Sequence, residues 1–217
     1  MCAVSELRSR PVAWLLFGLL VAPLLLACTK VADSGTPLTV GGDDDGYFGA
    51  KLTTPYDVPP VRLHDTADQP YSLSKDAKAE LTLVFFGYTH CPDVCQVVMA
   101  TIASALTRLD DDVRDRVDVV FVTTDPARDD AKTLRSYLDR FNPDFVGLTG
   151  PLAQVKRLGE GLKVYVARGQ ELPGGGYEVD HSTPIIGVRP DATAPMVWTQ
   201  GTSSAQLAAD IEKLVAP

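Results

Sequence analysis

The chain has 217 residues, 45% of them hydrophobic and 22% charged, a composition typical of a globular protein with one domain and additional segments. Its formal net charge is -8 at pH 7, so its general surface suits neither nucleic acid nor anionic lipid, and we expect no nucleic-acid partner. The chain contains four cysteines, and their positions decide which chemistry they can perform.

The start of the chain has the composition of an export signal. Arg8 and Arg10 precede an uncharged apolar segment, residues 11–27, which is short for a membrane span. The end of this segment, together with Cys28, resembles the lipobox of bacterial lipoproteins, in which the cysteine becomes the lipidated first residue. We therefore predict a signal peptide at residues 1–27 and a lipid anchor at Cys28. The alternative is an uncleaved membrane anchor.

Either alternative places the rest of the chain on the extracytoplasmic face of the cell membrane. Residues 28–58 are rich in Gly, Pro, Thr and Asp, so we interpret them as a flexible linker between the lipid anchor and the domain. The domain is then expected at residues 59–217. It keeps two cysteines, Cys91 and Cys95, because the other two leave with the signal or carry the lipid.

The domain is expected to begin with a β-hairpin, because residues 61–73 alternate apolar and polar side chains around a turn. Apolar runs then predict strands, and apolar residues at helical spacing predict helices. The expected strands are 81–89, 117–125, 163–167, 183–188 and 195–198, and the expected helices are 94–109, 129–141, 150–162 and 203–216. This order predicts an α/β domain with a central mixed sheet flanked by helices.

Cys91 and Cys95 fall where a predicted strand ends and a predicted helix begins. Residues four apart on a helix share a face, so two sulfurs here can converge on one metal ion, and the helix N-terminus should lower the pKa of both thiols. The same spacing can also close a disulfide. The pair is therefore a metal site or a dithiol redox couple. A purely structural disulfide is the weaker alternative, since the loop that it closes is very short.

A soft metal ion held by two sulfurs usually takes a third ligand, and the chain has three histidines. His64 lies in the predicted hairpin, and His90 adjoins the first cysteine, where its side chain should point in another direction. His181 follows a glycine-rich loop and is expected at the start of a strand, which suits a ligand on a movable segment. Asp125 is a candidate acceptor that supports the site from outside the ligand set, or a turn former. Asp129 is expected to cap or open the following helix.

Three segments, in this order, resemble the Sco/SenC family of copper-binding proteins. They are FFGYTHCPDVCQ at 85–96, the block at 122–150, and VDHSTPIIGV at 179–188. The similarity extends over most of the predicted domain. It implies a thioredoxin-like fold with an N-terminal β-hairpin extension.

The same resemblance implies that Cys91, Cys95 and His181 bind one copper ion, as Cu(I) or Cu(II). It also implies a metallochaperone that delivers copper to, or matures, the binuclear copper centre of cytochrome c oxidase. The partners would be the copper-bearing oxidase subunit, a copper donor protein or a thiol reductant, and the membrane through the lipid anchor.

The alternative is a membrane-anchored thiol-disulfide oxidoreductase, an enzyme that uses Cys91 and Cys95 as its redox pair. Thioredoxin-type motifs separate their cysteines by two residues, whereas this chain has three between them and adds His181. Thiolate sulfur suits Cu(I), and imidazole suits both copper states. These features favour copper binding.

Overall fold

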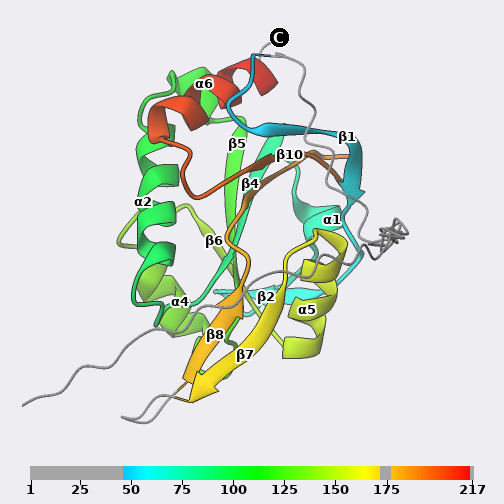
Figure 1. Ribbon diagram of the computed structural model, residues 1–217, viewed down its shortest axis with the longest axis vertical. Helices are drawn as coiled ribbons and strands as arrows, with labels where there is room; N and C mark the ends of the chain where they lie inside the picture. The colour runs from blue at the N-terminus through cyan, green and yellow to red at the C-terminus, as the bar shows by residue number, and fades with distance from the viewer. Residues whose placement is uncertain (1–45, 172–176, 216–217) are drawn as a thin grey trace, which may run out of the picture. The chain divides into compact units, whose positions relative to one another are not determined.

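The computed structural model describes residues 46–171 and 177–215 (Figure 1). The predicted signal peptide at 1–27, the predicted lipidation site Cys28 and most of the predicted linker 28–58 lie outside these residues. Within the described part of the chain, no helix is both long enough and apolar enough to cross a membrane.

An eight-stranded mixed sheet forms the centre of the domain. Its strands are β1 Ala50–Asp57, β2 Leu63–Asp65, β3 Pro70–Tyr71, β4 Leu81–Gly87, β5 Val117–Thr123, β6 Val146–Thr149, β9 Ile185–Val188 and β10 Thr193–Trp198. They are arranged in the order β1-β10-β9-β4-β5-β6-β2-β3. The central strands β4, β5 and β6 are parallel, and β9 and β10 continue the sheet in antiparallel pairing. This confirms the predicted α/β fold class, with β2 and β3 as the predicted hairpin.

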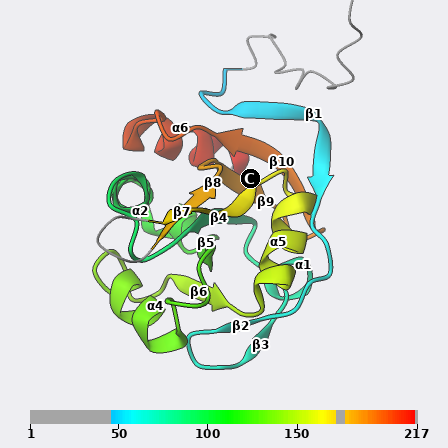
Figure 2. The same ribbon diagram turned by 60° about the horizontal axis from the view of Figure 1, so that its bottom comes forward.

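Helices cover both faces of this sheet (Figures 1 and 2). They are α1 Leu73–Asp76, α2 Val94–Leu106, α3 Asp111–Arg114, α4 Ala131–Leu138, α5 Leu152–Gly161 and α6 Ser204–Leu214. The last helix starts where its sequence indicates: the Ser203 hydroxyl accepts from the backbone of Gln206, whose side chain accepts from the backbone of Ser203. This capping box satisfies two N–H groups that the helix cannot pair itself.

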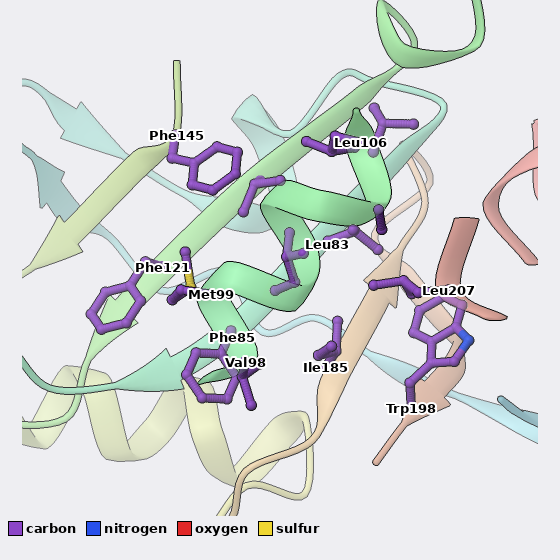
Figure 3. Packing of buried hydrophobic residues seen from close by; sticks show 14 of the residues in the cluster. Leu83, Phe85, Val98, Met99, Leu106, Phe121, Phe145, Ile185, Trp198 and Leu207 are labelled. Carbon is purple, nitrogen blue, oxygen red and sulfur yellow. The ribbon is translucent and has the colours of Figure 1, made fainter. Parts of the chain in front are cut away.

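The alternation of side chains along β4 divides the core into two clusters. Leu81, Leu83 and Phe85 pack with residues of α2, α4 and α6, whereas Val84 and Phe86 pack with residues of α1 and α5. Figure 3 shows side chains of the first cluster. All seven residues of β4 are buried, which explains why its sequence is continuously apolar. The loop that follows β4 is therefore attached to one of the most completely buried strands of the domain.

The structure corrects the predicted boundary between linker and domain. Residues 50–57 form β1, which pairs antiparallel with β10 with one register shift between Lys51 and Tyr56. The predicted linker 28–58 is therefore wrong in its last part, and the domain predicted from 59 includes this strand as well. The composition of the segment is polar, and its order comes from backbone pairing with a strand about 140 residues later, which local composition does not reveal.

A buried carboxylate holds the segment just before β1. Asp210, in α6, is fully buried and accepts hydrogen bonds from the backbone N–H of Phe48 at 3.0 Å and of Gly49 at 2.8 Å. The indole N–H of Trp198 donates to the same carboxylate at 2.8 Å. A side chain at Gly49 would collide with this indole ring, so the close approach requires glycine.

Two strands form a small sheet of their own. β7 Val166–Glu171 and β8 Tyr177–His181 pair antiparallel, and Figure 1 shows this hairpin in yellow and orange beyond one end of the large sheet. The sequence placed His181 at the start of a strand, but it is the last residue of β8. The missed signal is a period of two, since Tyr177, Val179 and His181 are more buried than the residues between them.

We expect Asp210→Ala to lower the free energy of unfolding by about 3 kcal/mol, because it leaves three N–H donors without their acceptor. Urea unfolding monitored by tryptophan fluorescence measures the effect. Glu212→Ala, at an exposed position on the same helix, is the control and should change stability by less than about 0.5 kcal/mol. Equal losses in the two variants would contradict the role assigned to Asp210.

Candidate functional site

The two cysteines lie in and just after the turn that leads from β4 into α2. Cys91 precedes the helix, and its backbone N–H donates to the Tyr88 carbonyl at 3.2 Å; Cys95 is the second residue of the helix. The prediction that both share one helical face is therefore wrong, because the chain turns before Cys91 and the helix begins after it. Both thiols are free, and the residues are 6% and 0% exposed respectively.

The end of β4 leaves just enough room for the second thiol. A Cβ atom added to Gly87 would lie 3.1 Å from Cys95 Sγ and 3.0 Å from ring atoms of Phe85 and Phe121. Such distances are shorter than ordinary contacts, so any larger residue would displace the sulfur or the rings. The packing of Gly87 against Phe85 and Phe121 thus limits how closely the Cys95 sulfur can approach the sheet.

The end of β8 brings His181 to the same place. Its Nε2 atom lies 3.7 Å from Cys95 Sγ, and its Nδ1 atom lies 3.0 Å from the carbonyl oxygen of Ser182. A carbonyl only accepts, so Nδ1 carries a proton and Nε2 is the ring nitrogen that faces the thiols. Nε2 presents a lone pair to them in the neutral ring and an N–H in the protonated ring. The rings of Phe85 and Tyr88 meet the imidazole edge-on, with centroids 6.4 and 5.9 Å away.

The two thiols differ in their pKa values. The hydrogen bond from Cys95 is the largest cause that lowers the pKa of Cys91, to about 3, and His181 and the backbone N–H groups of Asp93 and Cys95 act in the same direction. The hydrogen bond to Cys91, followed by burial, raises the pKa of Cys95. The prediction that both pKa values fall is therefore wrong for Cys95. In chemical terms, the pair is one thiolate that accepts a hydrogen bond from one thiol.

The sulfur and nitrogen donors of Cys91, Cys95 and His181 are of the type that soft metal ions prefer, but they do not yet surround a single position. For bonds of about 2.3 Å to sulfur and about 2.0 Å to nitrogen, two donors on one ion lie about 3.5–3.7 Å apart. Cys95 and His181 meet this requirement at 3.7 Å. Among residues 46–171 and 177–215, however, no three His, Cys, Asp or Glu side chains already form a group that could hold a metal ion.

The other two histidines lie apart from this group. His64, in β2, is 53% exposed in its side chain and contacts Asp68 at 3.1 Å. The side chain of His90 is 55% exposed, and its Nδ1 atom lies 3.0 Å from the Thr89 hydroxyl and 3.6 Å from Asp129. The structure thus brings together Cys91, Cys95 and His181 and leaves out the two histidines that the sequence analysis had disfavoured.

The two candidate aspartates, Asp125 and Asp129, lie in the loop after β5. Asp125 is buried; its carboxylate accepts from the Tyr177 hydroxyl at 2.6 Å and from Arg128, so it supports the hairpin that carries His181. Asp129 was expected to cap or open the helix, but α4 begins at Ala131 and its cap is Asp130, which accepts from the backbone of Thr133 at 2.7 Å.

The carboxylate of Asp129 instead points into the core, where the residue is 0% exposed. It accepts from the Thr89 backbone at 2.9 Å, the Thr89 hydroxyl at 2.6 Å and the Thr123 hydroxyl at 2.7 Å. Thr89 lies two residues before Cys91, so this carboxylate positions the turn of the first thiol. The sequence reasoning missed it, although two consecutive aspartates before a helix signalled that only one of them was needed as a cap.

The site opens to the surface through a hollow of about 410 Å³. Cys91, His181 and Tyr165 are among the residues that line it. Tyr165 is 63% exposed at this opening, which is high for an aromatic side chain. An ion can therefore reach the first thiol from solvent, while Cys95 lies deeper.

Comparison with known proteins assigns the domain to a family. The family model described as SCO1/SenC matches residues 52–216. The zebrafish (Danio rerio) protein "SCO2 homolog, mitochondrial" is 36% identical over 138 residues, which are 63% of this chain and 50% of that protein. The chain spans between 41% and 66% of the length of the first curated relatives that it matches.

Solved structures agree with this assignment. The copper-bound structure of Bradyrhizobium japonicum ScoI is 30% identical, with a TM-score of 0.66 over 73% of this chain and 99% of that one. The solution structure of apo Sco1 from Thermus thermophilus is 28% identical, with a TM-score of 0.68 over 78% of this chain and 97% of that one. The fold is thus the thioredoxin-like fold that the sequence predicted.

We expect the reduced protein to retain the ultraviolet absorbance of one thiolate down to about pH 4, because a thiol with a pKa of about 3 is deprotonated above that pH. A pH titration of this absorbance measures it. Cys91→Ala should remove the band at low pH, and Cys95→Ala should raise its midpoint by more than about one pH unit. A wild-type band that disappears below about pH 7 would contradict the coupling between the thiols.

Proposed function

The chain belongs to the SCO1/SenC family, and from this premise we propose that it binds one copper ion through Cys91, Cys95 and His181 and delivers it to the binuclear copper centre of cytochrome c oxidase. Copper is the cargo in this proposal and not a resident cofactor. The acceptor would be the copper-bearing subunit of the oxidase, and a copper donor protein or a thiol reductant would act before it.

One observation carries the proposal: His181 Nε2 lies 3.7 Å from Cys95 Sγ, and His181 and Cys91 line the same open hollow. Thiolates select Cu(I), and imidazole binds both oxidation states of copper. Zinc is the competing ion, but structural zinc is almost always held by four protein ligands, whereas the proposed site has three. Three ligands beside an opening suit an ion that must leave again.

The proposed location follows from the start of the chain. An export signal at residues 1–27 and lipid on Cys28 would hold the protein at the extracytoplasmic face of the membrane. The domain would then meet a membrane-bound oxidase on the same face. The acidic overall charge of the chain, -8, favours an acceptor whose docking surface is basic.

We expect Cys91→Ala and Cys95→Ala each to weaken Cu(I) binding by at least about 100-fold, since each removes a direct ligand and even supporting residues are worth 10–100-fold. Competition with a chromophoric Cu(I) chelator measures the affinity of the reduced protein. His64→Ala and His90→Ala are matched controls that remove an imidazole outside the group. Unchanged affinity in either cysteine variant, or a comparable loss in either control, would contradict the assigned ligands.

A second experiment separates copper delivery from dithiol reduction. Both functions need the same two sulfurs, so both predict that cells with Cys91→Ala lose oxidase activity. If delivery is the function, added copper should restore part of that activity by mass action, whereas a small extracellular thiol should not. We expect rescue by copper, because His181 has no evident use in a simple dithiol exchange. Rescue by the thiol alone would favour the oxidoreductase.

A further inference from the structure

The hairpin that carries His181 is not part of the large sheet. Its strands β7 and β8 pair with each other in a sheet of two, whereas Cys95 follows β4 in the middle of the sheet of eight. A strand inside a sheet is held by backbone ladders on both sides, but this hairpin depends on other contacts to keep its position. The contacts between the hairpin and the domain therefore decide where His181 stands relative to the thiols.

Strong polar contacts to the domain are found at the far end of β8 from the histidine. The Tyr177 hydroxyl donates to the Asp125 carboxylate at 2.6 Å, and the Arg128 guanidinium donates to the Tyr177 carbonyl at 3.0 Å. Arg128 also pairs with Asp125, and its guanidinium lies 4.0 Å from the centroid of the Tyr177 ring. The hydrogen bond to Asp125 is the largest cause that raises the pKa of Tyr177.

Strand geometry connects this end of β8 to the site. Tyr177, Val179 and His181 alternate with exposed residues, so all three face the domain. Val179, between them, is buried and packs against the core of the domain. Tyr177 and His181 are four residues apart, about 13 Å along the strand. If the contacts of Tyr177 are lost, the whole strand can tilt, and the tilt displaces His181.

We propose that Tyr177, Asp125 and Arg128 form a latch that sets the position of His181 over the two cysteines, with Tyr177 as the positioning residue. The proposal rests on the copper site described above and adds residues outside its ligand set. Arg128 extends the contact toward the site, since its guanidinium lies 5.8 Å from the centroid of Tyr88, the ring that meets the imidazole edge-on.

The latch should matter for one oxidation state of copper more than for the other. Two thiolates alone satisfy Cu(I), which accepts low coordination, whereas Cu(II) prefers further nitrogen or oxygen donors. A loosened hairpin would remove the imidazole for part of the time and leave both sulfurs in place. The latch therefore tunes the preference between Cu(II) and Cu(I).

The test begins without metal. Tyr177→Phe removes the hydroxyl and keeps the ring beneath Arg128, so the domain should fold as before. Amide hydrogen exchange of the copper-free, reduced protein should become at least about threefold faster in β8, while β4 and β5 stay unchanged. Tyr56→Phe is the matched control, because it removes a partly exposed tyrosine hydroxyl on β1, which does not line the hollow of the site.

The same variants are then titrated with copper. For Tyr177→Phe we expect Cu(II) affinity to fall about tenfold, with Cu(I) affinity unchanged and a weaker imidazole signature in the Cu(II) spectrum. His181→Ala gives the reference for complete loss of the imidazole ligand. Asp125→Ala should weaken Cu(II) binding at least as much as Tyr177→Phe, because it removes the ion pair with Arg128 as well as the contact with Tyr177. The double variant should be no worse than Asp125→Ala alone, since that change already removes the contact with Tyr177.

The outcomes separate this proposal from the proposed function. If the wild type binds copper and Tyr177→Phe matches Tyr56→Phe in both exchange and Cu(II) affinity, the latch is overturned. Additive losses in the double variant would also overturn it. If the wild type binds no copper, the proposed function fails. The latch is then judged from hydrogen exchange without metal. Faster exchange of β8 in Tyr177→Phe than in the wild type supports the latch, and unchanged exchange overturns it.

Discussion

The buried carboxylate of Asp129 is the interaction on which the geometry of the site depends. It is 0% exposed and accepts three hydrogen bonds, two from Thr89 and one from Thr123. A buried carboxylate is costly unless its lone pairs are satisfied, so the loop after β5 is stable in this form only with Thr89 beside it. Because Thr89 lies two residues before Cys91, the position of the first thiol follows from this contact.

One loop thus aligns both halves of the site. Asp129 holds the turn of the cysteines, and Asp125, four residues earlier, holds the hairpin of His181 through Tyr177. The two attachments differ in kind. The cysteines adjoin a strand that is buried along its whole length, whereas the histidine stands on a two-stranded sheet held by side chains. Two donors therefore adjoin the core, whereas the position of the third depends, in the proposed latch, on a side-chain contact.

The sequence predicted the parts of this arrangement that depend on local pattern. The apolar run of β4, the spacing of the cysteines and the hairpin at β2 and β3 were all visible, because burial on a sheet and turn chemistry leave local signals. Three features depend on partners far along the chain and were missed: the order of β1, the core position of Asp129, and the attachment of Tyr177 to Asp125, which is 52 residues away. A polar residue does not reveal from sequence alone whether it is paired inside the core or solvated.

The proton arrangement explains why the thiols alone do not decide the chemistry. A Cys91 thiolate beside a Cys95 thiol is as suitable for disulfide exchange as for binding a soft metal. Exchange, however, needs a partner disulfide to approach the attacking sulfur in line, and Cys91 is 6% exposed on the wall of its hollow. A small ion reaches such a sulfur more readily than a protein disulfide does. Since the Ser182 carbonyl also keeps Nε2 of His181 directed at the thiols, the arrangement as a whole favours coordination over exchange.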